Sequence, residues 1–522
     1  MIYITGQRIF KGSTMYNYNN LYNFKNTIRH FINIDSLIFP DDIAAFDISK
    51  LAWSAPFKYR IRKTSDSFRS LKIPNILVFA AAYEKMKNLP DFNNPTNLDE
   101  KHKRLSVNMR AGEFRIGSFE SCLKEDFEKL CIYDCLLKID IKEFYGRIYT
   151  HLLGMGDCER YLTDMNIGAT NGLIMGNYLS LYWAEKHLSD ISHDLESEFS
   201  EKNIECEFSY FSDDFYFFFN DGNENEIIKI FDRVLEKYDL ERNKDKKECW
   251  DYFSYNNYNV VEKYWKKIIS VCNQTRHQDT QNRLVFINQL IYRCSLLEDD
   301  KLRRILINGF FRTKYFRKDI NFSRYTFRNY DIHQLCFLFK VSPECLLYCA
   351  DRIEKISNFD ADYFKHFLEV RYKESLKKDF NEEQLYYFYA MKLWGFEDIL
   401  KQQNELVTYS RNQVLISYYL MENWFSVEQI ENLKQQKDEE LWFQSYHLIL
   451  YIQELFNNLD NSIDEYLLPS YAKKEAQKNA YREFYKNNLQ AKKSIVIPID
   501  EVNEKLNDYL EIRFEEHIRV CE

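Results

Sequence analysis

The sequence predicts an α+β fold over residues 1–265 and an all-α region over residues 266–522. Two short apolar segments in the first half alternate with polar residues and carry carboxylates, which indicates β-strands. Glycine is scarce, with 13 residues in 522, and six of them lie between residues 146 and 176. Beyond Gly222 only two glycines occur, so the second half lacks the turns that a β-rich fold needs.

The first strand is predicted within residues 135–145, which read CLLKIDIKEFY. Leu137, Ile139 and Ile141 alternate with polar positions, as expected for a strand with one buried face. Asp140 is then expected at the end of this strand. An alternative role for Asp140 is a helix N-cap directly after the strand.

The second apolar segment, residues 208–219, carries Asp213 and Asp214 between aromatic residues. Because successive side chains on a strand point to opposite faces, a tight turn is needed to direct both carboxylates to one point. Burial of two like charges is costly unless cations neutralise them. We therefore expect the pair at the tip of a β-hairpin beside a cation site, although Asp-Asp is also a common turn dipeptide.

Asp140, Asp213 and Asp214 together predict a site for two Mg²⁺ ions, with Mn²⁺ as an alternative. Nucleotidyl transfer uses one ion to activate the attacking oxygen and another to bind the triphosphate, and carboxylates from neighbouring strands hold both. We expect Asp140 and Asp213 to be the shared ligands and Asp214 to support them. This arrangement is typical of a polymerase palm.

Four segments in this order resemble motifs A to D of reverse transcriptases. They are Asp140-x-x-x-x-Tyr145, Gly172-Leu-Ile-Met-Gly176-x-x-x-Ser180, Phe211-Ser-Asp-Asp214 and Leu240-x-x-Asn243-x-x-Lys246. Motif B departs from the common Leu-Pro-Gln-Gly, so the residues that contact a template in the family differ here. The resemblance implies a reverse-transcriptase-like palm and fingers.

The resemblance also implies roles for single residues. Tyr145 would block a 2′-hydroxyl and so select deoxynucleotides, and Lys246 would protonate the departing pyrophosphate. Gly176 would let the backbone approach a base pair and open a helix. Lys244, Lys246 and Lys247 form a charge-rich stretch, and a solvated surface is the alternative for them.

Residues 59–63 and 68–74 resemble the two strands of the fingers hairpin. An arginine five residues before a proline binds the incoming triphosphate in that family, and Arg69 matches it. Arg62 or Lys63 would lie on the opposing strand, where a guanidinium suits bidentate phosphate contact. Basic residues on exposed hairpins otherwise serve solubility.

Apolar residues at helical spacing fill much of the second half. The segments 382–400, 412–422 and 427–433 show this spacing, and residues 426–429 form a capping box. Successive helical pairs joined by short polar turns predict an all-α, HEAT-like helical-repeat domain. A helical bundle is the alternative.

A reverse-transcriptase-like half followed by a helical half resembles the abortive-infection (Abi) reverse transcriptases of the AbiK, AbiA and prophage Abi type. Residues 144–151 after motif A also look like this group. The resemblance implies a phage-defence DNA polymerase, a nucleotidyltransferase that joins dNTPs without a template. It also implies a homo-oligomer in a bacterial or prophage-encoded setting.

In that group synthesis starts on a hydroxyl of the protein itself, so the single-stranded DNA product stays covalently attached. A tyrosine phenol suits this role because it is a long-reaching nucleophile. The N-terminal segment is polar and we expect it to be mobile, which makes Tyr16, Tyr18 and Tyr22 priming candidates. Serine or threonine priming is an alternative.

A basic segment in an otherwise acidic chain of net charge −9 is the predicted path of the product strand. Interleaved aromatic rings and cations are what single-strand binding requires. The alternative is a helical pair with core aromatics and surface arginines. Of the nine basic residues between 301 and 330, we expect nucleic-acid contacts above all from Arg312, Lys314, Arg317, Lys318 and Arg324.

Composition excludes several other classes. Aromatic residues at 17% and apolar residues at 45% exclude a disordered chain. The twelve cysteines form no Cys-x-x-Cys pair. Residues 1–10 show no secretory leader, and the longest apolar run, 76–82, is too short for a bilayer. We therefore expect a cytoplasmic protein without a membrane partner.

Two other functions fit the same residues. The first is a conventional RNA-templated reverse transcriptase of the retron or group II type. The second is a degenerate polymerase whose helical half binds other proteins as a scaffold.

Overall fold

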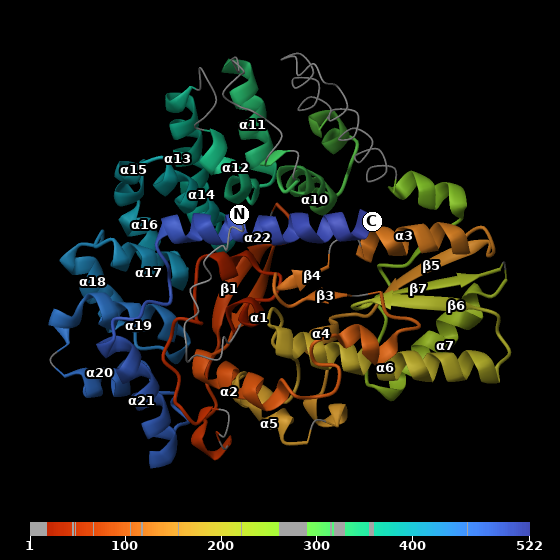
Figure 1. Cartoon of the computed structure of the whole chain (residues 1–522), viewed down its shortest axis with the longest axis horizontal. Helices are drawn as coiled ribbons and strands as arrows, with labels where there is room; N and C mark the ends of the chain where they lie inside the picture. The colour runs from red at the N-terminus through yellow and green to blue at the C-terminus, as the bar shows by residue number, and fades with distance from the viewer. Residues whose placement is uncertain are drawn as a thin grey trace, which may run out of the picture.

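The computed structural model describes residues 18–521 apart from a set of gaps. The residues left out are 44–45, 47, 66, 105, 116–117, 155, 221, 260–289, 314–315, 318–328, 354–359 and 457. The first half is α+β and the second half is helical, as predicted (Figure 1). The predicted boundary at residues 265 and 266 lies outside the described residues.

A four-stranded antiparallel sheet in the first half has the strand order β6-β7-β5-β8. Its strands are β5 (Cys135–Asp140), β6 (Glu207–Phe211), β7 (Asp214–Phe219) and β8 (Glu248–Trp250). The helices beside it are α3 (Ser118–Lys129), α6 (Tyr178–Glu201) and α7 (Glu224–Lys237).

Aromatic side chains fix this sheet between helices on both faces. On one face the ring of Phe217 lies 5.5 Å from that of Phe231 on α7 and 6.1 Å from that of Phe199 on α6. On the other face Leu136 and Phe218 join a separate apolar cluster with α3. The alternation of faces along β5 and β7 therefore follows the sequence pattern.

The other elements of the first half include a separate hairpin of β1 and β2. They are α1 (Tyr18–Tyr22), β1 (Phe57–Arg62), β2 (Phe68–Ile73), α2 (Ile76–Met86), β3 (Val107–Asn108), β4 (Glu113–Phe114), α4 (Phe144–Arg147) and α5 (Cys158–Asp164). Strands β1 and β2 pair in antiparallel fashion, which confirms the predicted hairpin.

The second half is a succession of helices. They are α10 (Asp300–Phe311), α11 (Asn329–Val341), α12 (Cys345–Ile353), α13 (Ala361–Lys378), α14 (Asn381–Leu393), α15 (Glu397–Gln402), α16 (Asn404–Thr408), α17 (Gln413–Met421), α18 (Val427–Gln435), α19 (Trp442–Tyr451), α20 (Leu459–Tyr466), α21 (Glu475–Gln490) and α22 (Ile499–Cys521). The capping box at Ser426 and Gln429 is confirmed. Gly395, with φ +69°, separates α14 from α15 inside the predicted segment 382–400. The HEAT-like repeat stays a prediction.

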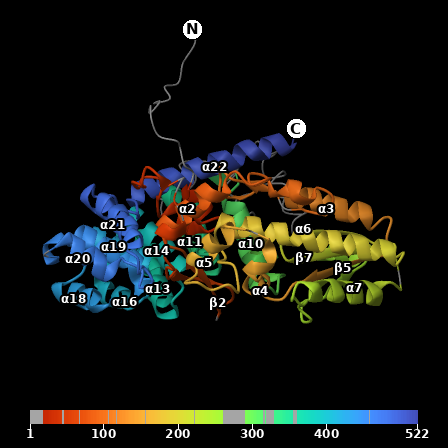
Figure 2. The same ribbon diagram turned by 90° about the horizontal axis from the view of Figure 1, so that it is seen from below.

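The long helix α22 returns from the helical half and crosses the first half (Figures 1 and 2). Lys505 on this helix donates to the carbonyls of Arg29 and Ile32, at 3.2 and 2.9 Å. Further along α22, the hydroxyl of Tyr509 donates to Glu113 on β4 at 2.8 Å. The two halves also share one apolar cluster, which contains buried residues from both.

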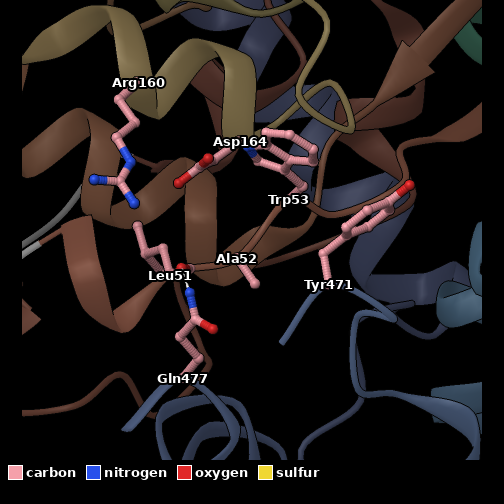
Figure 3. Close-up of a pocket in the computed structure, with 7 residues that line it drawn as sticks. All are labelled: Leu51, Ala52, Trp53, Arg160, Asp164, Tyr471 and Gln477. Atoms are coloured by element: carbon pink, nitrogen blue, oxygen red, sulfur yellow. Dashed lines mark hydrogen bonds between the residues drawn. The ribbon is translucent and has the colours of Figure 1, made fainter. Parts of the chain in front are cut away.

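A second junction holds residues 51–54 between α5 and α21 (Figure 3). The backbone N–H of Ser54 donates to the carbonyl of Asp164 at 2.9 Å. From the other side, the Gln477 amide donates to Leu51 O at 2.6 Å and the Tyr481 hydroxyl donates to Ala52 O at 3.1 Å. Among the residues described above, no helix is long and apolar enough to cross a membrane.

A fully buried ion pair offers a test of the packing around α6. Lys103 Nζ lies 2.8 Å from Glu185 Oε2, and neither side chain is exposed. Lys103→Met leaves a buried carboxylate without its cation, so we expect a loss of about 3–5 kcal/mol in the free energy of unfolding, measured in urea. Lys103→Met combined with Glu185→Leu should recover most of that loss.

The matched control is Lys101→Met, because Lys101 pairs with Glu196 on the surface. Exposed pairs contribute about 0–1 kcal/mol, so this variant should unfold like the wild type. Equal losses for Lys103→Met and Lys101→Met would contradict the interpretation.

Candidate active site

The three predicted carboxylates lie around the paired ends of β5 and β7. Asp140 on β5 stands opposite Asp214 on β7 in the strand register. Asp213 lies in the hairpin turn after Ser212, whose φ is +53°. The N–H of Ile141 donates to Asp213 O at 3.0 Å, which fixes the turn against β5. The predicted hairpin is therefore confirmed.

The N-cap alternative for Asp140 is wrong. Strand β5 ends at Asp140, whereas the next helix, α4, begins at Phe144 with Glu143 as its N-cap residue. The carboxylate of Asp140 accepts instead from Lys246, with Nζ 2.8 Å from Oδ2.

Lysines neutralise two of the three carboxylates. Besides the contact between Lys246 and Asp140, Lys138 Nζ lies 3.2 Å from Asp214 Oδ1. Burial raises the pKa of Asp213 above its ordinary value, and the charges of Asp214 and Asp140 raise it further. The unfavourable charge of the site is therefore concentrated on Asp213.

The donor chemistry of the site fits a divalent cation. Three carboxylates supply the hard oxygen ligands that Mg²⁺ prefers, and the repulsion that raises the pKa of Asp213 is what a cation relieves. As the side chains stand, the described part of the chain contains no group of three or more His, Cys, Asp or Glu arranged to hold a metal. A cation on Asp140 would displace Lys246, whose ammonium lies 2.8 Å from Asp140 Oδ2.

Backbone hydrogen bonds bring the four motif segments together. The N–H of Leu173, in the motif B segment, donates to Tyr145 O at 2.8 Å. The N–H of Asn243, in the motif D segment, donates to Asp140 O at 2.7 Å. Both loops thus meet the chain at or just beyond the end of β5, and Lys246 is placed beside Asp140.

Tyr145 lies partly buried in this site. Burial raises the pKa of its phenol well above the ordinary value, and the charges of Glu185 and Asp213 act in the same direction. The phenol is therefore neutral at physiological pH. Its proximity to Asp213 is compatible with the predicted contact with a sugar.

Gly176 occupies a position that other residues fit poorly. Its φ is +109°, and a Cβ atom there would lie 2.8 Å from the Asn26 amide nitrogen, which donates to Gly176 O at 3.1 Å. The next residue, Asn177, caps α6 by accepting from the N–H of Ser180 at 2.9 Å. The predicted start of a helix after Gly176 is confirmed.

The two hairpin arginines that were predicted to bind phosphate, Arg62 and Arg69, face in different directions. Arg69 is exposed and its guanidinium lies 3.7 Å from the sulfur of Met175 in motif B. Arg69 pairs with Ile61 across the hairpin, so the neighbouring Arg62 projects to the opposite face. Lys63 is exposed at the turn.

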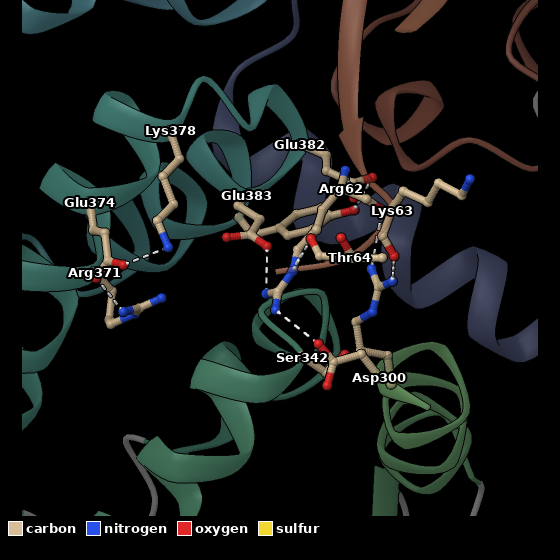
Figure 4. A network of polar contacts seen from close by, with 12 residues as sticks. Arg62, Lys63, Thr64, Asp300, Ser342, Arg371, Glu374, Lys378, Glu382 and Glu383 are labelled. Carbon is tan, nitrogen blue, oxygen red and sulfur yellow. Dashed lines mark hydrogen bonds and ion pairs between the residues drawn. The ribbon is translucent and has the colours of Figure 1, made fainter. Parts of the chain in front are cut away.

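Arg62 is held by the helical half instead of facing the site (Figure 4). The Arg62 guanidinium lies 3.0 Å from Glu383 Oε1, and the backbone N–H of Arg62 donates to Glu382 Oε1 at 3.2 Å. Arg304 on α10 also donates to the carbonyls of Arg62 and Lys63. The prediction that Arg62 is free to bind phosphate is therefore corrected.

Two of the predicted strand-binding arginines point inward. The Arg312 guanidinium stacks 5.4 Å from the centre of the Tyr348 ring. Arg317 pairs with Asp351 at 2.8 Å and donates to Tyr348 O at 2.7 Å. These contacts correct the prediction, since both side chains are engaged within the protein. Lys314, Lys318 and Arg324 lie outside the described residues.

The priming candidates are corrected as well. Tyr18 and Tyr22 have no exposed surface, although the segment was expected to be mobile. The Tyr18 hydroxyl donates to Glu84 at 2.8 Å, and the Tyr22 hydroxyl donates to Pro74 O. Both phenols are therefore buried and engaged within the protein. Tyr16 lies outside the described residues.

Sequence reasoning missed Lys138 as a member of the site. Side chains two residues apart on a strand share a face, so Lys138 and Asp140 project together from β5. That spacing was the available signal. A lysine on the same strand face as Asp140 is placed to neutralise an acid on the paired strand, which here is Asp214.

Comparisons with known proteins add little to this picture. No family model and no curated protein matches the sequence. Among solved structures, the chain is weakly similar to telomerase from Candida albicans in complex with the TWJ fragment of telomeric RNA, with 14% identity and a TM-score of 0.27. The match covers 66% of this chain and 66% of that one, so it spans just under two thirds of the telomerase.

Gly176→Ala tests the backbone of the motif B loop. The positive φ and the contact with Asn26 predict a loss of about 1–3 kcal/mol in the free energy of unfolding. The control is Gly309→Ala, because a Cβ there meets no atom within 4 Å and Gly309 lies inside α10. That control should stabilise the protein by about 0.5–1 kcal/mol. Equal effects in thermal denaturation would refute the account of Gly176.

Proposed function

We propose that the chain is a nucleotidyltransferase of the reverse-transcriptase type that polymerises dNTPs. In this proposal the sheet β6-β7-β5-β8 is the palm and the hairpin β1-β2 belongs to the fingers. The observation that carries the proposal is the register that sets Asp140 opposite Asp214, with Asp213 in the adjoining turn. The motif B and motif D loops close on the same region.

Each residue of the site then has a definite task. Mg²⁺ ions bound by Asp140 and Asp213, with Asp214 in support, would activate the attacking hydroxyl and neutralise the triphosphate. Tyr145 would lie beneath the sugar and exclude a 2′-hydroxyl. The Lys246 ammonium, already beside Asp140, would donate a proton to the departing pyrophosphate.

The exposed cations of the hairpin would complete the substrate site. Arg69 lies next to motif B and is free on its surface side to bind the triphosphate. Lys63 is exposed at the hairpin turn and could add a second contact. Arg62 would act indirectly, because it ties the hairpin to α14 through Glu383.

We further propose untemplated, protein-primed synthesis in phage defence, as in the abortive-infection reverse transcriptases. The altered motif B supports synthesis without a template, since this segment meets the template in templated relatives. The same resemblance supports a homo-oligomer in a bacterial cytoplasm. The primer would be a hydroxyl other than those of Tyr18 and Tyr22, because both are buried.

One observation favours a second candidate, a degenerate polymerase that acts as a scaffold. The ion pairs of Lys246 with Asp140 and of Lys138 with Asp214 satisfy two carboxylates without any metal. A site that had lost catalysis would be stabilised by such pairs. The two candidates differ in whether any nucleotide is incorporated.

The decisive experiment is incubation of the purified protein with Mg²⁺ and labelled dNTPs, without template or primer. Denaturing electrophoresis before and after protease digestion should show label on the protein that protease releases. Asp213→Asn should abolish the label without unfolding the protein, because it removes a metal ligand rather than a packing group.

Asp362→Asn is the matched control, because it makes the same change at an exposed position on α13. It should label like the wild type. Label that appears only with an added primer and template would indicate a conventional reverse transcriptase. No incorporation under any condition would favour the scaffold, and full activity of Asp213→Asn would refute the site.

Tyr145→Ala tests the proposed selection of deoxynucleotides. Removal of the ring opens space beside the sugar, so ribonucleotide incorporation should rise at least tenfold relative to deoxynucleotide incorporation, about 1.4 kcal/mol. Competition between labelled rNTPs and dNTPs measures the ratio. Tyr149→Ala, at an exposed position four residues further on, should leave the ratio unchanged. An unchanged ratio in Tyr145→Ala would show that another residue selects the sugar.

A further inference from the structure

An open cavity of about 430 Å³ lies at the junction of α5, residues 51–53 and the start of α21. Figure 3 shows the side chains around it, with Asp164 and Arg160 on one side and the rings of Trp53 and Tyr471 on the other. None of these residues belongs to the carboxylate site. The volume is in the range of small-molecule sites.

Two aromatic rings form a fixed but accessible wall. Trp53 is 44% exposed and Tyr471 is 45% exposed, and their ring centres are 5.1 Å apart at an angle of 54°. Gly168, with φ +78°, lets the Trp53 ring lie against the backbone, because a Cβ there would approach the ring to 2.6 Å. The rings are therefore held in place while much of their surface faces solvent, which suits contact with a flat ligand.

The opposite side carries a buried carboxyl group without a hydrogen bond to one oxygen. Asp164 is 1% exposed, and within the described part of the chain its Oδ2 has no hydrogen-bond partner. Burial raises the pKa of Asp164 to about 7, against the opposing effect of Arg160. A buried acceptor left unsatisfied is costly, so such groups in native proteins call for an explanation.

The backbone around Asp164 is fully committed, unlike its side chain. The carbonyl of Asp164 accepts from both the N–H and the hydroxyl of Ser54, at 2.9 and 3.2 Å. Gln477 is likewise engaged, since it donates to Leu51 O and accepts from the N–H of Lys474 at 3.1 Å. The two charged groups among the side chains that line the cavity are the Asp164 carboxyl and the exposed Arg160 guanidinium.

A carboxylate beside a guanidinium matches the polar edge of guanine. That edge presents two adjacent N–H donors, which a carboxylate accepts, next to the O6 and N7 acceptors, which an arginine binds in bidentate fashion. Adenine presents a different order of donors and acceptors. The flat faces of a base stack on aromatic side chains. A cationic ligand fits less well, because Arg160 would repel it.

We propose that this cavity binds the guanine base of a free guanosine nucleotide. Asp164 accepts from the base, Arg160 donates to it, and the rings of Trp53 and Tyr471 contact its face. The site is separate from the carboxylates of β5 and β7, so it does not depend on the proposed polymerase activity.

The test is calorimetric titration of the full-length protein with GMP, AMP, CMP and UMP, without metal or dNTPs, at pH 8, which lies above the raised pKa of Asp164 and keeps the carboxylate ionised. GMP should bind, and the other three should bind at least about tenfold more weakly, since a bidentate contact discriminates by about 1–3 kcal/mol. Asp164→Asn should weaken GMP binding by about tenfold or more, because an amide replaces one acceptor with a donor.

Two further variants keep the result interpretable. Asp157→Asn, an exposed acid at the N-terminus of the same helix, should bind GMP like the wild type. Arg160→Gln changes an exposed side chain, so it should fold normally and still weaken GMP binding. Asp213→Asn should leave GMP binding intact even where it abolishes polymerisation.

A short single-stranded DNA with one guanine distinguishes the source of the base. Weaker binding of this DNA than of GMP supports a free nucleotide, whereas tighter binding overturns that assignment in favour of a strand. Equal binding of all four nucleotides, no binding of GMP at millimolar concentration, or unchanged binding by both Asp164→Asn and Arg160→Gln would overturn the proposal.

Discussion

The pairing of β5 with β7 is the constraint on which the rest of the site depends. Their register sets Asp140 against Asp214, and β8 pairs with the other edge of β5. A slip of one residue would turn one of these carboxylates to the opposite face of the sheet. The apolar alternation that buries Leu137 and Phe217 therefore also aligns the acids, because any other register would expose the core.

The helical half does more than enlarge the core, because it completes the hairpin that carries Arg69. The N–H groups of Arg60 and Arg62 on the open edge of β1 donate to Asn381 and Glu382 at the start of α14. An unpaired strand edge is thereby covered. The guanidinium of Arg62 adds an ion pair with Glu383 from the same turn. Movement of the hairpin relative to α14 would break all these contacts at once.

The sequence predicted the sheet and its acids well because both follow from local alternation. It failed where partners lie far apart in the chain. Arg62 finds Glu383 more than 300 residues later, and Arg317 finds Asp351 on a separate helix. The polar N-terminal segment is expected from its composition to be mobile, but Asn19 is buried there and donates to Arg29 O at 2.9 Å. Composition alone does not reveal such hydrogen bonding.

The two lysines of the site link its stability to its proposed chemistry. Lys138 is about one-fifth exposed and lies on a strand, so its partner Asp214 keeps a fixed counter-charge. Lys246 is 60% exposed on a loop, and its long side chain can leave Asp140 at little cost. In the proposed mechanism a cation would take its place on Asp140. The ammonium released by that exchange would then be free, beside the reacting phosphates, to serve as the proton donor.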